Sequence, residues 1–415
     1  MKTLRLMLLC ACLLGAGIRP AAAQEVSIRP EEKNFADTIP VEFVQNWIIV
    51  PVTIHGKAHR FIFDTGASYS VVRPDLLPAD TRIVRLDSVG DAHNRKKEMA
   101  FAELCGLSIG KLRFPCYPVL LHSTEGDTPW KCAGIDGFIG GDILQCLSVK
   151  IDKRKKHLIW TDRKKWFKAD KRAARSMKVI HNRPFVEVQI GKVKETDVLF
   201  DTGDNGSFYS LCRDVFRQLK TFKPKRWKGE VTATTRGVTG FGLFGLAVTD
   251  SIARVRLPEW KLNGIRFGNV ETQTCTSVSS RIGAGLLDYG QVILDYPQRK
   301  FVFVPYQEEG LITVSDLGQY SIGYEDGHIF LSLIWEDSDL YRQGARQGDR
   351  IIEINRIPLE DDLCRMMEVA GKGVQQLKLM NREGEEKEFF LGNPYSLQGE
   401  TKGFPAANAS PEANQ

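Results

Sequence analysis

Two aspartates stand where an apolar run ends, although a carboxylate is costly to bury beside apolar side chains. Asp64 lies in FIFDTGASYS at residues 61–70, and Asp201 lies in VLFDTGDNGSFYS at residues 198–210. One Asp-Thr-Gly alone is typical of a turn. Two copies after similar apolar runs instead predict a pair of carboxylates that is kept for chemistry.

Longer repeats surround both aspartates. The segment IIVPVTIHGKAHRFIFDTG (48–66) matches PFVEVQIGKVKETDVLFDTG (184–203), and GFIGGDILQCLSVKIDKRKKHLIW (137–160) matches RIGAGLLDYGQVILDYPQRKFVFV (281–304). Both copies alternate with period two between Gly, Asp and Pro turns, which predicts β-strands. We infer two copies of a β-rich domain, and a two-fold relation between them would bring both aspartates together.

A close pair of carboxylates supports general acid–base hydrolysis. The two groups resist ionising together and so share one proton. The ionised member can take a proton from water, while the protonated member hydrogen-bonds the substrate carbonyl oxygen. Thr65 and Thr202 can donate hydroxyl and backbone N–H groups across the axis. Gly66 and Gly203 let the backbone approach the carboxylates closely.

These motifs resemble the aspartic proteases, in particular retropepsin-like lobes fused in one chain to give a pepsin-like bilobal arrangement. DTGAS fits the active-site loop of that family, while IDGFIGGDIL and RIGAGLL resemble the segment that closes the loop in each lobe. The resemblance covers residues from about 40 to 306 and implies a mainly β fold of two β-barrel lobes. It also implies an endopeptidase that hydrolyses a polypeptide substrate with no cofactor or metal. The implied catalytic dyad is Asp64 and Asp201, with active-site support from Thr65, Gly66, Ser68, Thr202 and Gly203.

The second loop departs from the family pattern at Asp204, where a small residue is expected. A carboxylate beside the dyad would raise the pKa values of the coupled pair, and so would move activity toward neutral pH or impair the site. We favour the alternative that Asp204 points to solvent in an enlarged turn, since aspartate is rarely buried.

Two segments are candidates for flaps that close over the cleft and exclude water. DSVGDAHNRKK, between Leu86 and Glu98, is the candidate in the first lobe. RGVTGFGLFG, at residues 236–245, is the candidate in the second lobe. Its apolar candidate flap residues are Val238, Phe241 and Phe244. The alternative is an ordinary hairpin whose apolar residues belong to the core.

The C-terminal third is expected to form a separate small α+β domain. GARQGDRIIEINRIPL, at residues 344–359, resembles the G-x-x-x-G-D-x-I-x-x-I-N segment of PDZ domains. Such domains bind a peptide C-terminus by adding it to a sheet edge. The candidate peptide loop contains Ile322, Gly323 and Tyr324. The alternative is a degenerate PDZ-like fold used only for packing.

The first residues have the pattern of a secretory signal peptide. A basic start at Lys2 and Arg5 is followed by an apolar run and a cleavage site after Ala23. We therefore expect an exported protein, periplasmic or extracellular and bacterial, without stable membrane insertion, because the run is shorter than the ~20 residues of a span. A lipoprotein attached at Cys12 is the alternative.

The expected division is 1–23 signal peptide, 24–162 first lobe, 163–180 basic linker that is helical in part, 181–306 second lobe, 311–393 PDZ-like domain and 394–415 disordered tail.

Composition excludes some classes of function. The chain has 57 Lys and Arg against 51 Asp and Glu, and three of the basic residues lie in the signal peptide, so no nucleic-acid signature remains. The histidines form no metal-ligand pattern, and no Gly-rich phosphate loop occurs. Of the nine cysteines, Cys105 and Cys116 are close enough to bridge a hairpin. Pairing is not deducible from sequence, and most cysteines are expected to be small buried apolar residues.

Other functions remain open at this point. A catalytically impaired protein could bind peptides in the cleft or in the PDZ groove. A peptidase could also process only itself or one dedicated partner. A phosphotransferase aspartate would need a lysine or second aspartate with Mg²⁺ ligands, and it would not explain the duplication.

Overall fold

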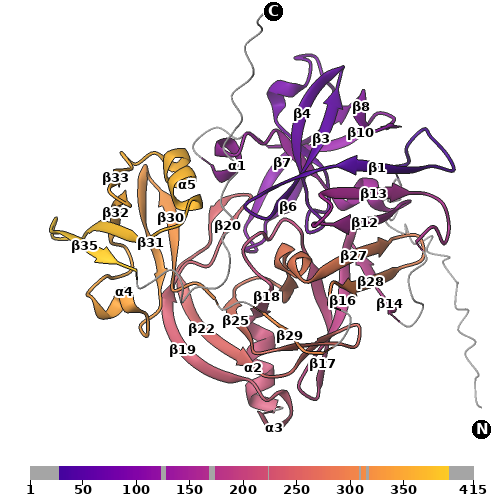
Figure 1. Ribbon diagram of the computed structural model, residues 1–415. Coiled ribbons are helices and arrows are strands. Elements are labelled where there is room, and N and C mark those ends of the chain that lie inside the picture. The colour runs from indigo at the N-terminus through magenta and orange to yellow at the C-terminus, as the bar shows by residue number, and fades with distance from the viewer. Residues whose placement is uncertain are drawn as a thin grey trace, which may run out of the picture.

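The computed structural model describes residues 28–122, 128–167, 173–222, 224–307, 310–314 and 317–391. The expected signal peptide and C-terminal tail lie outside these residues. The described residues form two β lobes with a smaller unit beside them (Figure 1), which confirms the prediction of a mainly β, bilobal fold. No helix in the described part of the chain is long and apolar enough to cross a membrane.

The first lobe is a ten-stranded sheet with the order β6-β7-β10-β5-β11-β4-β3-β8-β9, and β2 pairs with β3. The strands in chain order are β2 (Glu42–Val44), β3 (Trp47–Ile54), β4 (Lys57–Phe63), β5 (Val71–Val72), β6 (Ile83–Gly90), β7 (Lys96–Leu104), β8 (Leu107–Ile109), β9 (Leu112–Arg113), β10 (Tyr117–Leu121) and β11 (Gly137–Ile139).

The second lobe is an eleven-stranded sheet with the order β19-β22-β25-β18-β26-β17-β16-β23-β24-β29, and β15 pairs with β16. Its strands are β15 (Lys178–Ile180), β16 (Arg183–Ile190), β17 (Val193–Phe200), β18 (Tyr209–Cys212), β19 (Glu230–Gly237), β22 (Asp250–Leu257), β23 (Trp260–Leu262), β24 (Ile265–Gly268), β25 (Val270–Cys275), β26 (Arg281–Ile282) and β29 (Ile312–Thr313). A short ribbon of β20 (Phe241–Gly242) and β21 (Gly245–Leu246) extends from it.

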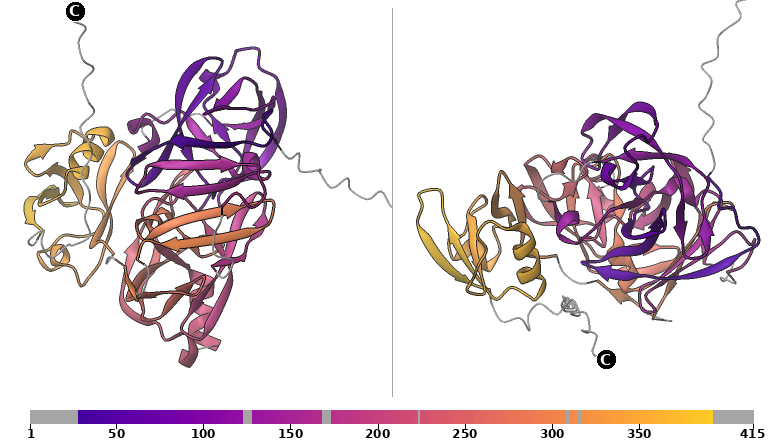
Figure 2. Two further views of the ribbon diagram at one scale, coloured as in Figure 1. Left: turned by 45° about the vertical axis from the view of Figure 1, so that its right-hand side comes forward. Right: turned by 90° about the horizontal axis from the view of Figure 1, so that it is seen from above.

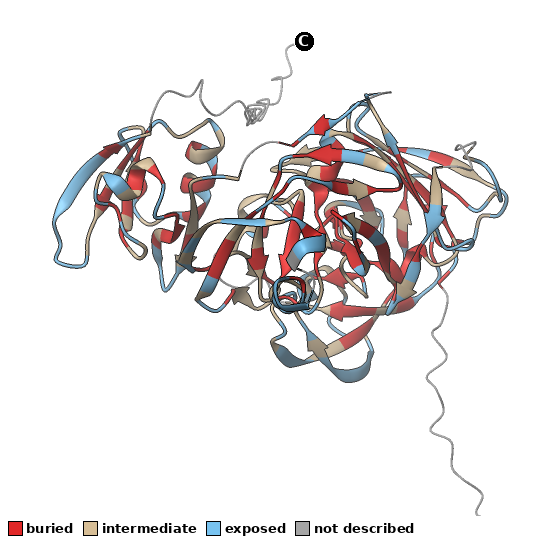
Figure 3. Ribbon diagram, turned by 90° about the horizontal axis from the view of Figure 1, so that it is seen from below, coloured by how far each residue is buried: buried red, intermediate tan, exposed pale blue. Residues whose placement is uncertain are grey.

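The two sheets repeat one topology strand by strand. In each lobe the strand before the aspartate pairs in parallel with the strand of the closing segment, β4 with β11 and β17 with β26. The register is also the same, because Phe63 faces Ile139 and Phe200 faces Ile282. These four side chains are fully buried. Their burial fixes the ends of β4 and β17. Asp64 and Asp201, which follow these ends directly, therefore lie at equivalent positions in the two lobes. Figure 3 shows the buried residues gathered along the inner strands of both lobes.

A third sheet joins the lobes in the order β1-β13-β12-β27-β28-β14. Its strands are β1 (Ala36–Pro40), β12 (Ser148–Asp152), β13 (His157–Thr161), β14 (Ala174–Ser176), β27 (Gly290–Asp295) and β28 (Lys300–Pro305). Within this sheet the two lobes meet at the antiparallel pair β12–β27, and Figure 2 shows these strands stacked between the lobes. The expected linker is partly helical, but its described C-terminal end is extended, because β14 pairs with β28 and β15 with β16. Residues 168–172 of this linker lie outside the described residues.

Helices are few and short. They are α1 (Pro129–Cys132), α2 (Arg213–Phe222), α3 (Pro224–Trp227), α4 (Asp339–Arg342) and α5 (Leu363–Gly371), with 3-10 turns η1 (Pro74–Leu76), η2 (Gly141–Leu144) and η3 (Ala284–Asp288). The turns η2 and η3 occupy equivalent places directly after β11 and β26, as the repeat predicts.

The C-terminal unit is a sheet of order β30-β31-β32-β34-β35, with β33 beside β32 and helices α4 and α5. Its strands are β30 (Tyr320–Glu325), β31 (His328–Ile334), β32 (Arg350–Ile354), β33 (Ile357–Pro358), β34 (Gln376–Met380) and β35 (Glu386–Phe390). The prediction of a peptide-binding loop at Ile322, Gly323 and Tyr324 is wrong, because these residues lie inside β30 and pair with β31. The physical reason is the turn Asp326–Gly327, whose positive φ angles are those of a two-residue hairpin.

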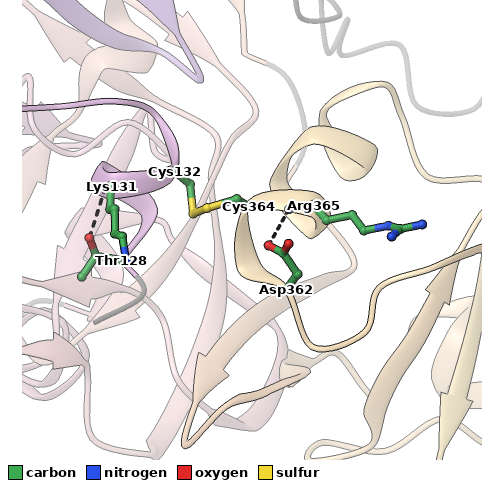
Figure 4. The surroundings of a disulfide bond; sticks show 6 residues. All are labelled: Thr128, Lys131, Cys132, Asp362, Cys364 and Arg365. Atoms are coloured by element: carbon green, nitrogen blue, oxygen red, sulfur yellow. Dashed lines mark hydrogen bonds between the residues drawn. A yellow bond between two sulfur atoms is a disulfide. The ribbon is translucent and has the colours of Figure 1, made fainter. Parts of the chain in front are cut away.

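The C-terminal unit is attached to both lobes. The N–H of Val238 donates to the Ser332 carbonyl at 2.9 Å, and the Thr235 hydroxyl donates to the Ile334 carbonyl at 2.6 Å. On the other side, a disulfide joins Cys132 of α1 to Cys364 of α5 (Figure 4). The second lobe is therefore held by hydrogen bonds and the first lobe by a covalent bond.

Four of the seven cysteines in the described residues form disulfides and three are free, so the expectation that most of them are small buried apolar residues is wrong. Besides Cys132–Cys364, a second disulfide joins Cys105 to Cys116 at the β7–β10 connection. Export into an oxidising compartment would allow both bonds.

Candidate active site

Hydrogen bonds between the two Asp-Thr-Gly loops fix their relative position. The N–H of Thr65 donates to the Thr202 hydroxyl at 3.0 Å, and the N–H of Thr202 donates to the Thr65 hydroxyl at 3.1 Å. Each hydroxyl then donates across the axis to a carbonyl, Thr65 to Phe200 at 2.7 Å and Thr202 to Phe63 at 2.6 Å. Both threonines are fully buried. These four bonds lock the loops into one unit.

Each aspartate is bound by its own loop and lies against the other. Asp64 accepts N–H bonds from Gly66 at 2.8 Å and Ala67 at 3.1 Å. Asp201 accepts the equivalent bonds from Gly203 at 3.0 Å and from residue 204 at 3.2 Å. A Cβ at Gly66 would lie 2.3 Å from an Asp201 oxygen, and one at Gly203 would lie 2.6 Å from the Asp64 carboxyl. The structure therefore brings the two predicted aspartates together across the lobe boundary.

The dyad holds a proton to high pH. Burial, and next the charge of Asp201, raise the pKa of Asp64 from its ordinary 3.8 to about 8. A hydrogen bond with Asp201 acts in the same direction, while the N–H bonds of Gly66 and Ala67 oppose the shift. The proton of the pair thus stays bound through the neutral range, and one carboxyl remains a donor there.

We predict that Asp64→Asn stabilises the protein near neutral pH. The folded pKa lies above the unfolded one, so stability falls as pH rises from about 4 toward about 8. An amide avoids this cost, so the free energy of unfolding should rise by ~1–3 kcal/mol near pH 7 and change little near pH 4. Denaturant unfolding at both pH values checks this. Asp201→Asn should have the opposite sign, because it leaves the buried Arg281 without its 3.5 Å partner.

Two asparagines at equivalent positions of the repeat, one in each lobe, hold the Asp-Thr-Gly loop of the other lobe. The Asn46 side-chain amide donates to the Asn205 carbonyl at 3.1 Å, and that of Asn182 donates to the Ser68 carbonyl at 3.0 Å. The Trp47 indole N–H also donates to the Gly203 carbonyl at 3.2 Å. Ser68 thus contributes its backbone to the site.

The glycines of the loops allow a sharp comparison. We expect Gly66→Ala to lower any activity of the dyad at least about 10²-fold, because its Cβ would displace the Asp201 carboxyl. The matched control is Gly206→Ala in the second loop, where a Cβ would meet nothing within 4 Å. Activity of both variants, measured on refolded and monodisperse protein, checks this. Equal activities would contradict the close approach.

Asp204 points inward, so the expectation that it faces solvent is wrong. Its side chain is 17% exposed and accepts a hydrogen bond from the Ser207 hydroxyl at 2.7 Å. The Arg281 guanidinium lies 4.0 Å from the Asp204 carboxylate. Burial raises the pKa of Asp204 above its usual range, although Arg281 opposes this shift. The buried cation explains why a carboxylate is tolerated here.

Both flap candidates are hairpins, and their tips meet. The first hairpin is β6–β7 with its tip at 91–95, and the second is β19–β22 with the β20–β21 ribbon. Arg95 donates to the Leu246 and Gly245 carbonyls at 2.8 and 2.7 Å. Arg281 donates to the Ala92 carbonyl at 3.3 Å. The first hairpin is therefore closed on the second lobe.

The predicted residues of the second hairpin pack on other parts of the chain. Val238 is buried and bonded to the C-terminal unit, Phe241 lies 5.4 Å from the Trp130 ring, and the Lys97 ammonium lies 5.1 Å from the Phe244 ring centre. These contacts suit the alternative of an ordinary packed hairpin.

Residues missed by the sequence reasoning are Asn46, Trp47, Asn182, Arg183 and Arg281. A signal was present, because Asn46-Trp47 and Asn182-Arg183 stand at the same place in the repeats. No group of three or more His, Cys, Asp or Glu side chains in the described ranges is arranged to hold a metal ion.

Comparisons with known proteins give distant similarities of fold. No protein-family model and no curated protein matches the chain. Among solved structures, conglutin gamma, a basic 7S globulin from lupine seeds, has 10% identity and a TM-score of 0.38 over 66% of this chain and 96% of its own. The aspartic proteinase from Irpex lacteus has 11% identity and a TM-score of 0.41 over 65% and 97%. The basic 7S globulin from soybean has 10% identity and a TM-score of 0.39 over 65% and 95%. TM-scores this low carry no argument about the function of the site, which therefore depends on the geometry described above.

Proposed function

We propose that the chain is an aspartic endopeptidase. The observation that carries this proposal is the pair Asp64–Asp201, locked across two lobes and holding one proton through neutral pH. A structural protein has no need of two buried carboxyl groups held against each other, since such a pair costs stability.

The chemistry follows from the shared proton. The ionised member of the pair takes a proton from a water molecule, whose oxygen bonds to the substrate carbonyl carbon, while the protonated member gives its proton to the carbonyl oxygen. The amide nitrogen is then protonated by the dyad, the C–N bond breaks, and the hydroxyl proton of the intermediate returns to the dyad. The pair ends with the single proton with which it began.

Substrate access requires the hairpins to separate. Arg95 joins the tips by two hydrogen bonds, so a polypeptide must break them to lie along the dyad. Closure over the bound chain would then exclude bulk water and strengthen the electrostatic interactions within the site.

The test is cleavage of denatured proteins and of a peptide library by the purified chain from about pH 3 to about pH 8, with cut sites located by mass spectrometry. The matched control is Asp64→Asn/Asp201→Asn, purified in parallel. New termini in the wild-type sample alone support the proposal. Termini in both samples, or in neither after prolonged incubation, contradict it.

For the C-terminal unit we propose a PDZ-like fold that serves packing within this chain. The bond from Val238 to Ser332 and the disulfide Cys132–Cys364 support this role. Export to the periplasm or the cell exterior is proposed with it, and the two disulfides support an oxidising compartment. Capture of a peptide C-terminus by this unit, measured by calorimetry, would contradict the packing role.

A further inference from the structure

The two lobes share one topology, so each provides a reference for the other. Around the dyad three equivalent positions differ in charge. Residue 67 is Ala and residue 204 is Asp, and the N–H of each donates to its own aspartate. Phe138 of β11 and Arg281 of β26 occupy the same register, each one residue before the buried isoleucine. Trp47 and Arg183 likewise begin equivalent strands. All three charged residues belong to the second lobe.

Arg281 is placed to act on the dyad. Its side chain is only 13% exposed, and its guanidinium lies 3.5 Å from the Asp201 carboxylate and 4.0 Å from that of Asp204. A third contact goes to the Ala92 carbonyl at the tip of the first hairpin, at 3.3 Å. The equivalent residue, Phe138, instead packs on Trp130 at 5.2 Å and brings no charge to this position. The duplicated site is therefore electrically asymmetric.

The other charged groups near Arg281 do not cancel this asymmetry. Arg183 interacts with both dyad carboxyls and with Arg281, and burial lowers its pKa. His93 in the first hairpin has its pKa lowered to about 4, first by burial and then by Arg281, so it is neutral near pH 7. Cys275 of β25 is half-buried, and desolvation raises its pKa, so it stays a thiol there. The nearest countercharges of Arg281 are thus Asp201 and Asp204.

We propose that Arg281 is a positioning residue of the dyad, which holds Asp201 as the ionised carboxylate and so leaves the shared proton on Asp64. This inference rests on the proposed peptidase function and deepens it by assigning base and acid. Asp204 is part of the same arrangement. The dyad with one proton carries a single negative charge, which cannot neutralise both Arg281 and Arg183, and the Asp204 carboxylate supplies the second negative charge. The contact with Ala92 connects this arrangement to the closed first hairpin.

The test compares pH profiles of kcat/KM. In Arg281→Met the acid limb should move up by about one pH unit, because Asp201 loses the opposite charge that favours its ionised form. Arg281→Lys should shift the limb less, and Arg281→Met/Asp204→Asn should return it toward the wild-type position. The control is Arg254→Met, which removes an arginine that is equally buried at 12% exposure but pairs with Asp337. An acid limb that moves no more than in the control overturns the proposal.

A second readout needs no turnover. Infrared difference spectra between each protein and its Asp201→Asn derivative report the protonated Asp201 carboxyl as pH is lowered. The band should appear about one pH unit higher in Arg281→Met than in wild type. If no peptide is cut but this shift occurs, the peptidase proposal fails and the role of Arg281 stands. If peptides are cut and the band does not shift, the role of Arg281 fails alone.

Discussion

Replacing either dyad aspartate by asparagine should abolish peptide cleavage. We expect Asp64→Asn and Asp201→Asn each to lower kcat by at least about 10³-fold, because the first removes the proton donor and the second removes the base. The side-chain volumes hardly change, and the threonine bonds between the loops do not involve either carboxylate. Single-turnover cleavage of one identified peptide, with matched circular dichroism spectra, is the measurement.

A buried aspartate outside the site provides the control for this pair. Asp37 is 8% exposed in the central sheet and accepts the N–H of Lys111 at 2.8 Å. Asp37→Asn should keep kcat within a few-fold of wild type, since its loss affects packing and not the reacting atoms. If the dyad variants retained the wild-type rate, the dyad would not be the catalyst. If they bound peptide normally while wild type also failed to cut, the protein would be a peptide-binding relative of the enzyme.

The dyad could be predicted because the motif occurs twice, so each copy can be compared with the other. Asp64 alone looks like a turn residue, but its second copy after an equivalent strand excludes coincidence. The threonine bonds across the axis follow from the same symmetry. What duplication cannot predict is a position where the copies differ. FIGGDIL (138–144) and RIGAGLL (281–287) align without gaps, and the mismatch of Phe138 with Arg281 was visible in the sequence. Its meaning depends on the register of β26 against β17, which places the guanidinium beside Asp201.

Other errors came from weighing residues one at a time. Asp204 was expected in solvent because lone carboxylates avoid burial, but the cation that compensates it lies far away in sequence. The candidate peptide loop around Gly323 ignored the Asp326–Gly327 turn, a strong hairpin signal between two apolar runs. The pair Cys105–Cys116 was within reach of sequence reasoning, because the two residues lie close together in the chain. The pair Cys132–Cys364 was not, because its members are separated by 232 residues.

That long-range disulfide has the second largest predicted effect, now on stability. Cys132→Ser/Cys364→Ser opens a loop of 232 residues, which the chain-entropy model values at about 5 kcal/mol. The loss should fall mainly on the docking of the C-terminal unit, since α1 and α5 meet at this bond (Figure 4). Hydrogen exchange resolved by peptide is the measurement. The amide of Val238, which donates to Ser332, should exchange at least about tenfold faster in the variant.

The second disulfide is the matched control. Cys105 and Cys116 are only 11 residues apart within the first lobe, so Cys105→Ser/Cys116→Ser should cost about 3 kcal/mol in the same entropy model. That loss should leave exchange at Val238 unchanged, because the bond does not reach the C-terminal unit. Faster exchange in both variants would show that general destabilisation is the cause. Unchanged exchange at Val238 in both variants would show that hydrogen bonds alone hold the second hairpin, and that the Cys132–Cys364 disulfide is not needed for this. Faster exchange in the first variant alone shows that the disulfide holds this unit against the hairpin beside the dyad, so that the oxidation state of Cys132–Cys364 controls how firmly the site is covered.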